Sequence, residues 1–198
     1  AANPSLVRLL TSPFALTPGF EGPPQPTGLV PEYDEASGTW AAPFVMATIN
    51  TKNVHRSNYL LGHAYGADFT YDEMMMTTIG EAGKAMAEGI AKALRSANPF
   101  GDGPQPQPGE GPSKEERENG FYSLLFIGEF PDGSTVKASV KGDRDPGYGS
   151  TSKMIAESAL TLLENDTPGG VVTPGGIIAA PLLDRLQANA GIEFAIEA

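Results

Sequence analysis

The chain has 198 residues, of which 40% are hydrophobic, enough for a globular domain with a real core. Lys and Arg number 13 against 24 Asp and Glu, and the resulting net charge of −11 argues against nucleic acid and anionic membrane surfaces as partners. The absence of cysteine and the presence of two histidines exclude disulfides, thiolate chemistry and His-rich metal sites, so we expect no metal.

The N-terminal part of the chain is rich in proline. Residues 12–38 contain six prolines and several glycines, a density that opposes regular helices and strand pairing, so an extended segment is expected there. Asn50 and Thr51 then offer an N-cap for a helix that ends near Leu61. The apolar residues of this helix that are expected to face the core are Val54, Leu60 and Leu61.

The middle of the chain alternates between stretches with regularly spaced apolar residues and a stretch rich in proline and glycine. Residues 68–76 alternate apolar and polar side chains, which predicts a strand. Residues 78–96 have helical periodicity, with a predicted apolar face made of Ile79, Ala82, Met86, Ile90 and Leu94. Proline and glycine dominate residues 98–113, which predicts a mobile loop.

The C-terminal part predicts a hairpin followed by helices and a last strand. Residues 131–134, Pro-Asp-Gly-Ser, form a turn sequence between strands over 121–130 and 135–141. A helix over 150–163 follows, with the apolar residues Met154, Ile155, Ala159, Leu162 and Leu163. Thr173 and Pro174 then begin a second helix that ends near residues 189–191, with the apolar stripe Ile178, Leu182, Leu183 and Leu186.

A final strand is predicted over 192–196. Only one pair of neighbouring strands is a clear hairpin, so the remaining connections require crossovers. The element order therefore predicts an α+β fold, with a mostly antiparallel or mixed sheet of four to six strands and helices packed on one face. Residues 1–198 are expected to form a single domain.

Residues 142–153, GDRDPGYGSTSK, stand between a predicted strand and a predicted helix, where nucleotide-binding proteins carry phosphate loops. Gly142 and Gly147 have the glycine spacing of a P-loop, but Tyr148 occupies the lysine position and Asp143 and Asp145 would repel phosphate. No G-x-G-x-x-G lies between a strand and a helix, so we expect no cofactor-binding residue in this chain.

Two interpretations of this loop stay open. In the first, Arg144 forms local ion pairs with its acidic neighbours, and Ser150 or Thr151 caps the following helix. In the second, a set of polar side chains at the strand-to-helix junction binds a polar substrate. That set is Arg144, Tyr148, Ser150 and Lys153.

A second polar cluster occupies residues 50–58. It is either a solvated helix surface or a substrate-facing helix, in which His55 could carry a proton because its reference pKa lies near neutrality. The candidate substrate-binding residues are Asn50, His55, Arg56 and Asn58. The sequence assigns no catalytic residue.

Three stretches carry a resemblance to a known family. They are residues 42–75, APFVMATINTKNVHRSNYLLGHAYGADFTYDEMM, residues 142–163, GDRDPGYGSTSKMIAESALTLL, and residues 169–194, GGVVTPGGIIAAPLLDRLQANAGIEF. Together they resemble the C-terminal part of saccharopine-dehydrogenase-like oxidoreductases, and within that family the subgroup of bacterial trans-acting enoyl reductases.

The resemblance implies a chain that works with a partner domain. Family members bind NAD(P) on an N-terminal Rossmann domain, while the C-terminal α+β domain shapes the substrate pocket and contributes to a dimer. The present sequence matches the second half and begins Ala1-Ala2 without methionine, so a fragment of a longer enzyme is expected. NADP or NAD would then be bound by the missing Rossmann domain, and the fragment alone would be inactive.

The implied function is the substrate-binding and dimerisation portion of an NAD(P)-dependent reductase that acts on a carbonyl or enoyl group of a small-molecule or lipid-like substrate. The alternative is a stand-alone binding or oligomerisation module without catalytic activity. No apolar run approaches the roughly 20 residues that span a bilayer, and no signal peptide is visible, which predicts a cytoplasmic protein without a membrane span. The resemblance implies that this protein is a homodimer.

Overall fold

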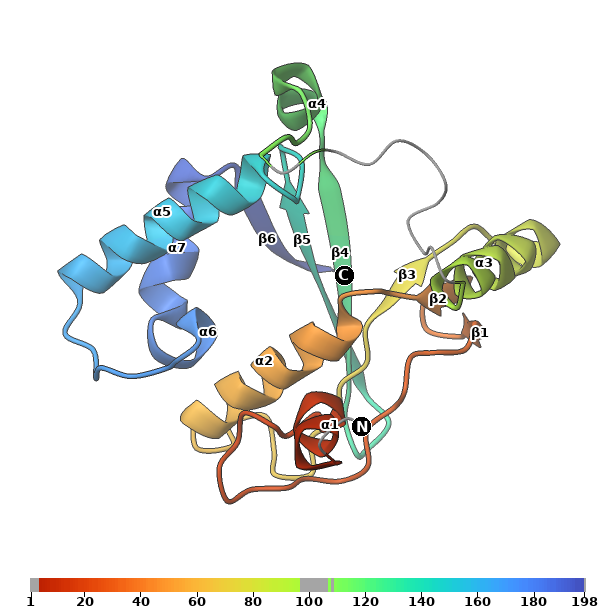
Figure 1. Cartoon of the computed structure of the whole chain (residues 1–198), viewed down its shortest axis with the longest axis horizontal. Coiled ribbons are helices and arrows are strands. Elements are labelled where there is room, and N and C mark those ends of the chain that lie inside the picture. The colour runs from red at the N-terminus through yellow and green to blue at the C-terminus, as the bar shows by residue number, and fades with distance from the viewer. Residues whose placement is uncertain (1–3, 97–106, 108, 198) are drawn as a thin grey trace. The chain divides into compact units, whose positions relative to one another are not determined.

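The structure is a computed structural model that describes residues 4–96, 107 and 109–197 (Figure 1). It divides the chain into two compact units, Ala1–Pro104 and Gln105–Ala198, and each unit is described by itself. The loop predicted over 98–113 lies mostly outside the described residues. Within the described part of the chain, no helix combines the length and apolar character needed to cross a membrane.

The first unit contains a three-stranded antiparallel sheet in the order β1-β2-β3. Its elements are α1 (Pro4–Thr11), β1 (Glu32–Asp34), β2 (Thr39–Pro43), α2 (Ala47–Leu60), β3 (Met74–Met76) and α3 (Gly80–Leu94). Residues 32–34, at the end of the predicted extended segment, pair with β2 because the prolines end at Pro31. The Asp34 carboxylate accepts bonds from two N–H groups of the following turn.

The helix predicted over 78–96 is confirmed as α3, but its predicted apolar face is wrong. Ile79 and Met86 are exposed, and the buried residues are Gly83, Ala87 and Ala91, spaced four apart. These small residues let α3 lie close to β2, whose Ala41 and Ala42 are also buried. The strand predicted over 68–76 shortens to β3, because only residues 74–76 have a partner in β2.

The second unit contains an antiparallel sheet in the order β4-β5-β6. Its elements are α4 (Lys114–Asn119), β4 (Tyr122–Glu129), β5 (Thr135–Gly142), α5 (Gly149–Glu164), α6 (Pro174–Ile177), α7 (Ala179–Asn189) and β6 (Ile192–Glu197). The helices α5, α6 and α7 lie on one side of this sheet (Figure 1). The core between the two layers contains Ile178, Leu182, Leu186, Ala190 and Ile192, with Val140, Met154, Ile177 and Phe194 packed against it.

The predicted hairpin and last strand are confirmed. Gly133 adopts φ +82° in the turn between β4 and β5, and the Phe130 N–H donates to the Ser134 carbonyl at 2.9 Å. The helix predicted from Pro174 is interrupted at Ile178, which separates α6 from α7. The sequence analysis did not identify α4, although Ser113 and Glu116 form a capping box at its start.

The predicted apolar face of α5 is mostly exposed. Ile155, Leu162 and Leu163 are exposed, whereas Ser150 and Thr161 are buried. Leu183 of α7 is exposed as well, while Ile178, Leu182 and Leu186 are buried as predicted. The α+β class and the antiparallel pairing are confirmed, and the strands of the described residues form two sheets of three.

Candidate functional site

The helix α2 carries the first group of predicted site residues. It begins at Ala47, three residues before the predicted cap, so Asn50 and Thr51 lie inside the helix. The Asn50 amide donates to Glu73 Oε1 at 2.9 Å, and the Tyr71 hydroxyl donates to Glu73 Oε2 at 3.3 Å. Burial, followed by the charge of Glu73, strongly raises the pKa of Tyr71. Glu73 is therefore already hydrogen-bonded within the unit.

His55 is buried among aromatic rings and lacks a polar partner for one nitrogen. Its side chain is 3% exposed, and its ring lies 4.6 Å from the ring of Phe14 and 5.8 Å from that of Phe69, measured between centroids. Among the described residues, Nε2 has no hydrogen-bond partner. Burial lowers the pKa of His55, so the imidazole is neutral near pH 7.

His63 repeats the pattern on the same group of rings. It adopts φ +63°, and its ring centroid lies 4.1 Å from that of Phe20, which contacts Phe14 edge-to-face at 5.9 Å. Its Nδ1 is buried and, in the described part of the chain, also has no partner. Both histidines of the sequence thus belong to one aromatic cluster, defined as Phe14, Phe20, His55, His63 and Phe69.

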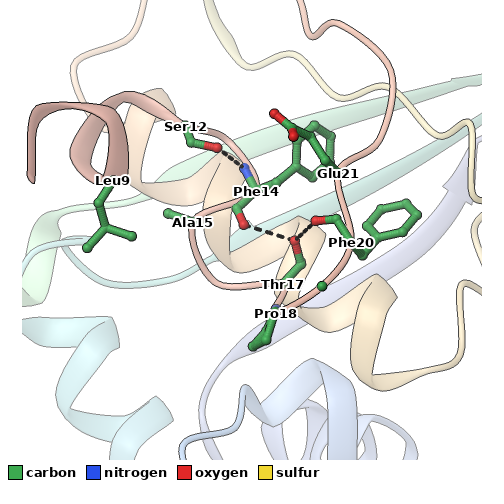
Figure 2. A pocket seen from close by; sticks show the side chains of 9 residues that line it. Leu9, Ser12, Phe14, Ala15, Thr17, Pro18, Phe20 and Glu21 are labelled. Carbon is green, nitrogen blue, oxygen red and sulfur yellow. Dashed lines mark hydrogen bonds between the residues drawn. The ribbon is translucent and has the colours of Figure 1, made fainter. Parts of the chain in front are cut away.

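The segment before Glu21 contributes Phe14 and Phe20 to this cluster. Polar groups of α2 hold the segment in place: the Arg56 guanidinium donates to the Leu16 carbonyl at 3.0 Å, and the Tyr59 hydroxyl donates to the Pro18 carbonyl at 3.1 Å. A pocket of about 310 Å³ lies in the segment itself. Figure 2 shows the side chains that line it. It is lined by Leu9, Ser12, Phe14, Ala15, Thr17, Pro18, Gly19, Phe20 and Glu21. Phe14 contacts both this pocket and His55.

Asn58 supports the turn that follows α2. Its side chain is buried, its amide donates to the Gly66 carbonyl at 2.8 Å, and its Oδ1 accepts from the Tyr65 N–H at 2.9 Å. Asn58 and Arg56 therefore bond to backbone groups of their own unit. Val54 and Leu60 are half-buried and Leu61 is exposed, so the buried side of α2 is formed by Ala47, His55 and Asn58 rather than by the predicted apolar residues.

The neutral state of His55 predicts how stability changes with pH. The folded pKa lies below the unfolded value of about 6.5, so the unfolded chain binds the proton more readily. The unfolding free energy should be constant in this respect above pH 6.5, and should fall by up to about 1.4 kcal/mol per pH unit as the pH drops toward the folded pKa. Urea unfolding, followed by the fluorescence of Trp40, measures this slope.

The matched control is His55→Phe, which keeps a ring between Phe14 and Phe69 and removes the titrating group. This variant should lose the extra slope below pH 6.5. An equal slope in both proteins would show that burial does not lower the pKa of His55 in the folded state.

The loop 142–153 carries the second group of predicted residues, and Asp145 organises it. The Asp145 carboxylate accepts the N–H groups of Gly147 at 2.9 Å, Tyr148 at 3.0 Å and Gly149 at 2.6 Å. These bonds, led by that of Gly149, lower the pKa of Asp145. Asp145, rather than Ser150 or Thr151, therefore supports the N-terminus of α5.

The other predicted residues of this loop differ in their accessibility. Ser150 is buried, and its hydroxyl lies 2.9 Å from the Tyr122 hydroxyl. The Lys153 ammonium lies 3.4 Å from Asp143 and 3.2 Å from the Ala190 carbonyl. Arg144 pairs with Glu118 at 3.8 Å. Tyr148, by contrast, is 58% exposed. Arg144 therefore pairs with the more distant Glu118 rather than with its acidic neighbours, and the Tyr148 ring stays accessible.

The loop does not fit the pyrophosphate of a dinucleotide. A phosphate at a helix N-terminus needs free backbone N–H groups. Here the N–H groups of residues 147, 148 and 149 are all bonded to the Asp145 carboxylate, which places a negative charge where a phosphate would bind. In this strand-to-helix turn, the Asp145 carboxylate therefore occupies the place where a phosphate would bind.

The structure assigns the two predicted groups to different units. Asn50, His55, Arg56 and Asn58 lie on α2 of the first unit, and the others lie on the loop before α5 or on α5 itself, in the second. Sequence reasoning considered His63 as a pocket-lining residue but did not select it as a site residue. It missed the aromatic rings, of which Phe14 lies 41 residues before His55. No periodic spacing links these residues; the shared signal is that they include every histidine of the chain.

Proteins similar to this chain occur in mycobacteria. No protein-family model matches the chain, and no solved structure matches it. A Mycobacterium tuberculosis H37Rv protein provisionally named a trans-acting enoyl reductase is 35% identical over 220 residues, which cover 97% of the chain and 51% of the relative.

Two further relatives have the same name. The trans-acting enoyl reductase of Mycobacterium bovis BCG is 32% identical over 222 residues, covering 97% of the chain and 51% of the relative. That of Mycobacterium ulcerans is 32% identical over 213 residues, covering 94% of the chain and 50% of the relative. The chain is thus homologous to mycobacterial trans-acting enoyl reductases over nearly all of its length, and spans about half the length of these relatives.

Proposed function

We propose that this chain is the substrate-binding and dimerisation portion of an NAD(P)-dependent, saccharopine-dehydrogenase-like reductase that acts on an enoyl substrate. The observation that carries the proposal is the similarity to trans-acting enoyl reductases over 97% of the chain. NADP or NAD would be bound by the part of the enzyme that the relatives possess beyond the matched half. The loop 142–153 supports this assignment of the cofactor to the other part of the enzyme. Its N–H groups at residues 147–149 bond to Asp145 and are not free for a pyrophosphate.

The aromatic cluster is the part of the chain best suited to an enoyl substrate. Its rings offer an apolar surface to the hydrocarbon part, and the unpartnered His55 Nε2 offers a hydrogen bond to the acyl oxygen. Because His55 is buried, substrate entry requires the segment before Glu21 to move away from α2. The bonds from Arg56 and Tyr59 to backbone carbonyls are the contacts that such a movement would break.

The test is reductase activity of the whole enzyme that contains this chain. We expect oxidation of NADPH or NADH that depends on a 2-enoyl thioester. His55→Phe should lower kcat/KM for the thioester by about 100-fold, the typical effect of removing a hydrogen-bond donor to a developing oxyanion. The KM for the nicotinamide cofactor should not change, because the cofactor is bound elsewhere.

The control variant is Asn53→Ala, which alters an exposed side chain of the same helix and should leave both constants unchanged. Among the described residues, this side chain bonds only to the Ile49 carbonyl. Arg144→Ala and Tyr148→Ala test the loop: unchanged NADPH consumption in both would restrict the loop to bracing α5. An enzyme that oxidises no NAD(P)H with any 2-enoyl thioester would contradict the proposal. If the neighbouring gene sequence also lacks a strand followed by G-x-G-x-x-G, the chain is instead a stand-alone binding or oligomerisation module.

A further inference from the structure

The strand β4 leaves one of its two edges unpaired. It lies at the end of the sheet order β4-β5-β6 and pairs with β5 over all eight of its residues without a bulge. Within the described residues of the second unit, its backbone makes no hydrogen bond to any segment other than β5. A row of free N–H and C=O groups of this length is a template for pairing with another strand.

The side chains of β4 lack the features that protect exposed edges in monomers. The strand, YSLLFIGE, contains no lysine or proline, and its one charge, Glu129, is at its end. Leu124 is 46% exposed and Phe126 44% exposed on the side of the sheet that faces the helices, and Leu125 is 38% exposed on the opposite side. The other edge of the sheet, β6, differs because it carries Glu193 and Glu197.

We infer that β4 pairs with β4 of a second copy of this chain, antiparallel and about a two-fold axis at Leu125. A two-fold axis perpendicular to a sheet keeps each side chain on its own face, so it must pass through a residue position. At Leu125 it places Leu124 opposite Phe126 of the second copy, twice, and Leu125 opposite itself. These cross-strand pairs are apolar throughout, and such pairs stabilise antiparallel sheets.

The charges of the strand agree with this register. The two Glu129 residues lie at opposite ends of the paired strands, each opposite Phe121 of the other copy, so no like charges meet. An axis at Phe126 would pair Leu125 with Ile127, but it would place Leu124, the most exposed of the three at 46%, opposite Gly128. The result is a continuous six-stranded sheet with α5, α6 and α7 of both copies on the same face. This inference gives a location to the dimerisation part of the proposed function and rests on it.

The first test is the association state of the chain, measured by sedimentation over a concentration series. We expect a dimer, and Phe126→Lys should raise its dissociation constant at least tenfold. Ile196→Lys is the matched control: residue 196 lies in the same row of the sheet as Phe126, on the opposite edge, and is 77% exposed. The control should remain a dimer.

The second test uses the absence of cysteine from the chain. In Leu125→Cys the two thiols would lie on directly opposite residues, about 4.5–5.5 Å apart between Cα atoms, which is within reach of a disulfide. Mild oxidation should therefore link this variant into a dimer. Ile127→Cys should link at least tenfold less, because its two copies lie four residues out of register.

Three results would overturn the inference: a monomer at all concentrations, equal cross-linking at 125 and 127, or dissociation by Ile196→Lys in place of Phe126→Lys. Both tests measure assembly and not reduction. An active enoyl reductase that stays monomeric would therefore overturn this inference alone, and an inactive dimer would overturn the reductase proposal alone.

Discussion

Gly83→Ala is expected to destabilise the first unit by about 2 kcal/mol, an overpacking cost reduced by the gain in helix propensity. A Cβ at this buried position would lie 1.7 Å from the Thr78 carbonyl oxygen, and the Gly83 carbonyl also accepts the Thr77 hydroxyl at 3.0 Å. The contact is with backbone, so no side-chain rotation can relieve it. The start of α3 must move away from the preceding residues.

Urea unfolding followed by Trp40 fluorescence measures this change. Trp40 is the single tryptophan of the chain, and it lies in β2, with the Lys84 ammonium of α3 5.4 Å from its ring centroid. Gly89→Ala is the control on the same helix: nothing lies within 4 Å of a Cβ there, so it should stabilise α3 by about 0.5–1 kcal/mol. If both variants shift stability in the same direction, the close approach at Gly83 is wrong.

Gly142→Ala is expected to destabilise the second unit by about 2–3 kcal/mol through overpacking and a lost buried hydrogen bond. Gly142 is paired directly with Tyr122, whose ring covers it, and an added Cβ would lie 2.1 Å from that ring. Displacing the ring would also separate the Tyr122 hydroxyl from the buried Ser150 hydroxyl, 2.9 Å away. The strand, its neighbour and α5 are therefore coupled at this point.

Amide hydrogen exchange of the peptides that contain β4 and β5 measures this effect without a tryptophan. The control is Tyr122→Phe, which keeps the ring over Gly142 and removes the hydroxyl, and should cost about 1–2 kcal/mol. Ser150→Ala should add little to Gly142→Ala, because the same hydrogen bond is already lost. Full additivity of these two substitutions would contradict the coupling between Tyr122 and Ser150.

Local chemistry explains which elements could be predicted from the sequence. The turn at residues 131–134 needs a residue with positive φ, and Gly133 supplies it, so the hairpin was predictable. The end of α7 and the start of β6 are marked by Gly191, which adopts φ +67°. Predictions that depended on burial failed more often. Periodicity indicates that 78–96 is helical, but the choice between Met86 and Ala87 as the buried residue depends on how closely β2 approaches.

The candidate sites show the same division. The sequence left two interpretations of 142–153 open, a braced turn and a substrate-binding loop, and the bonds of Asp145 brace the turn. That Asp145 would provide the cap, and that Ser150 would be buried under Tyr122, could not be read from the loop. Tyr122 lies on another strand, and the residue spacing within the loop does not indicate contacts with distant segments.

The sequence by itself determined the α+β class, the antiparallel hairpin, and the positions of α3, α5 and β6. These features depend on residues within one turn or one strand of each other. The tertiary structure alone decided that the strands form two sheets, that α3 buries its small residues, and that both histidines join one aromatic cluster with unpartnered nitrogens. Such features depend on contacts between distant segments, because a residue is buried only where another part of the chain packs against it.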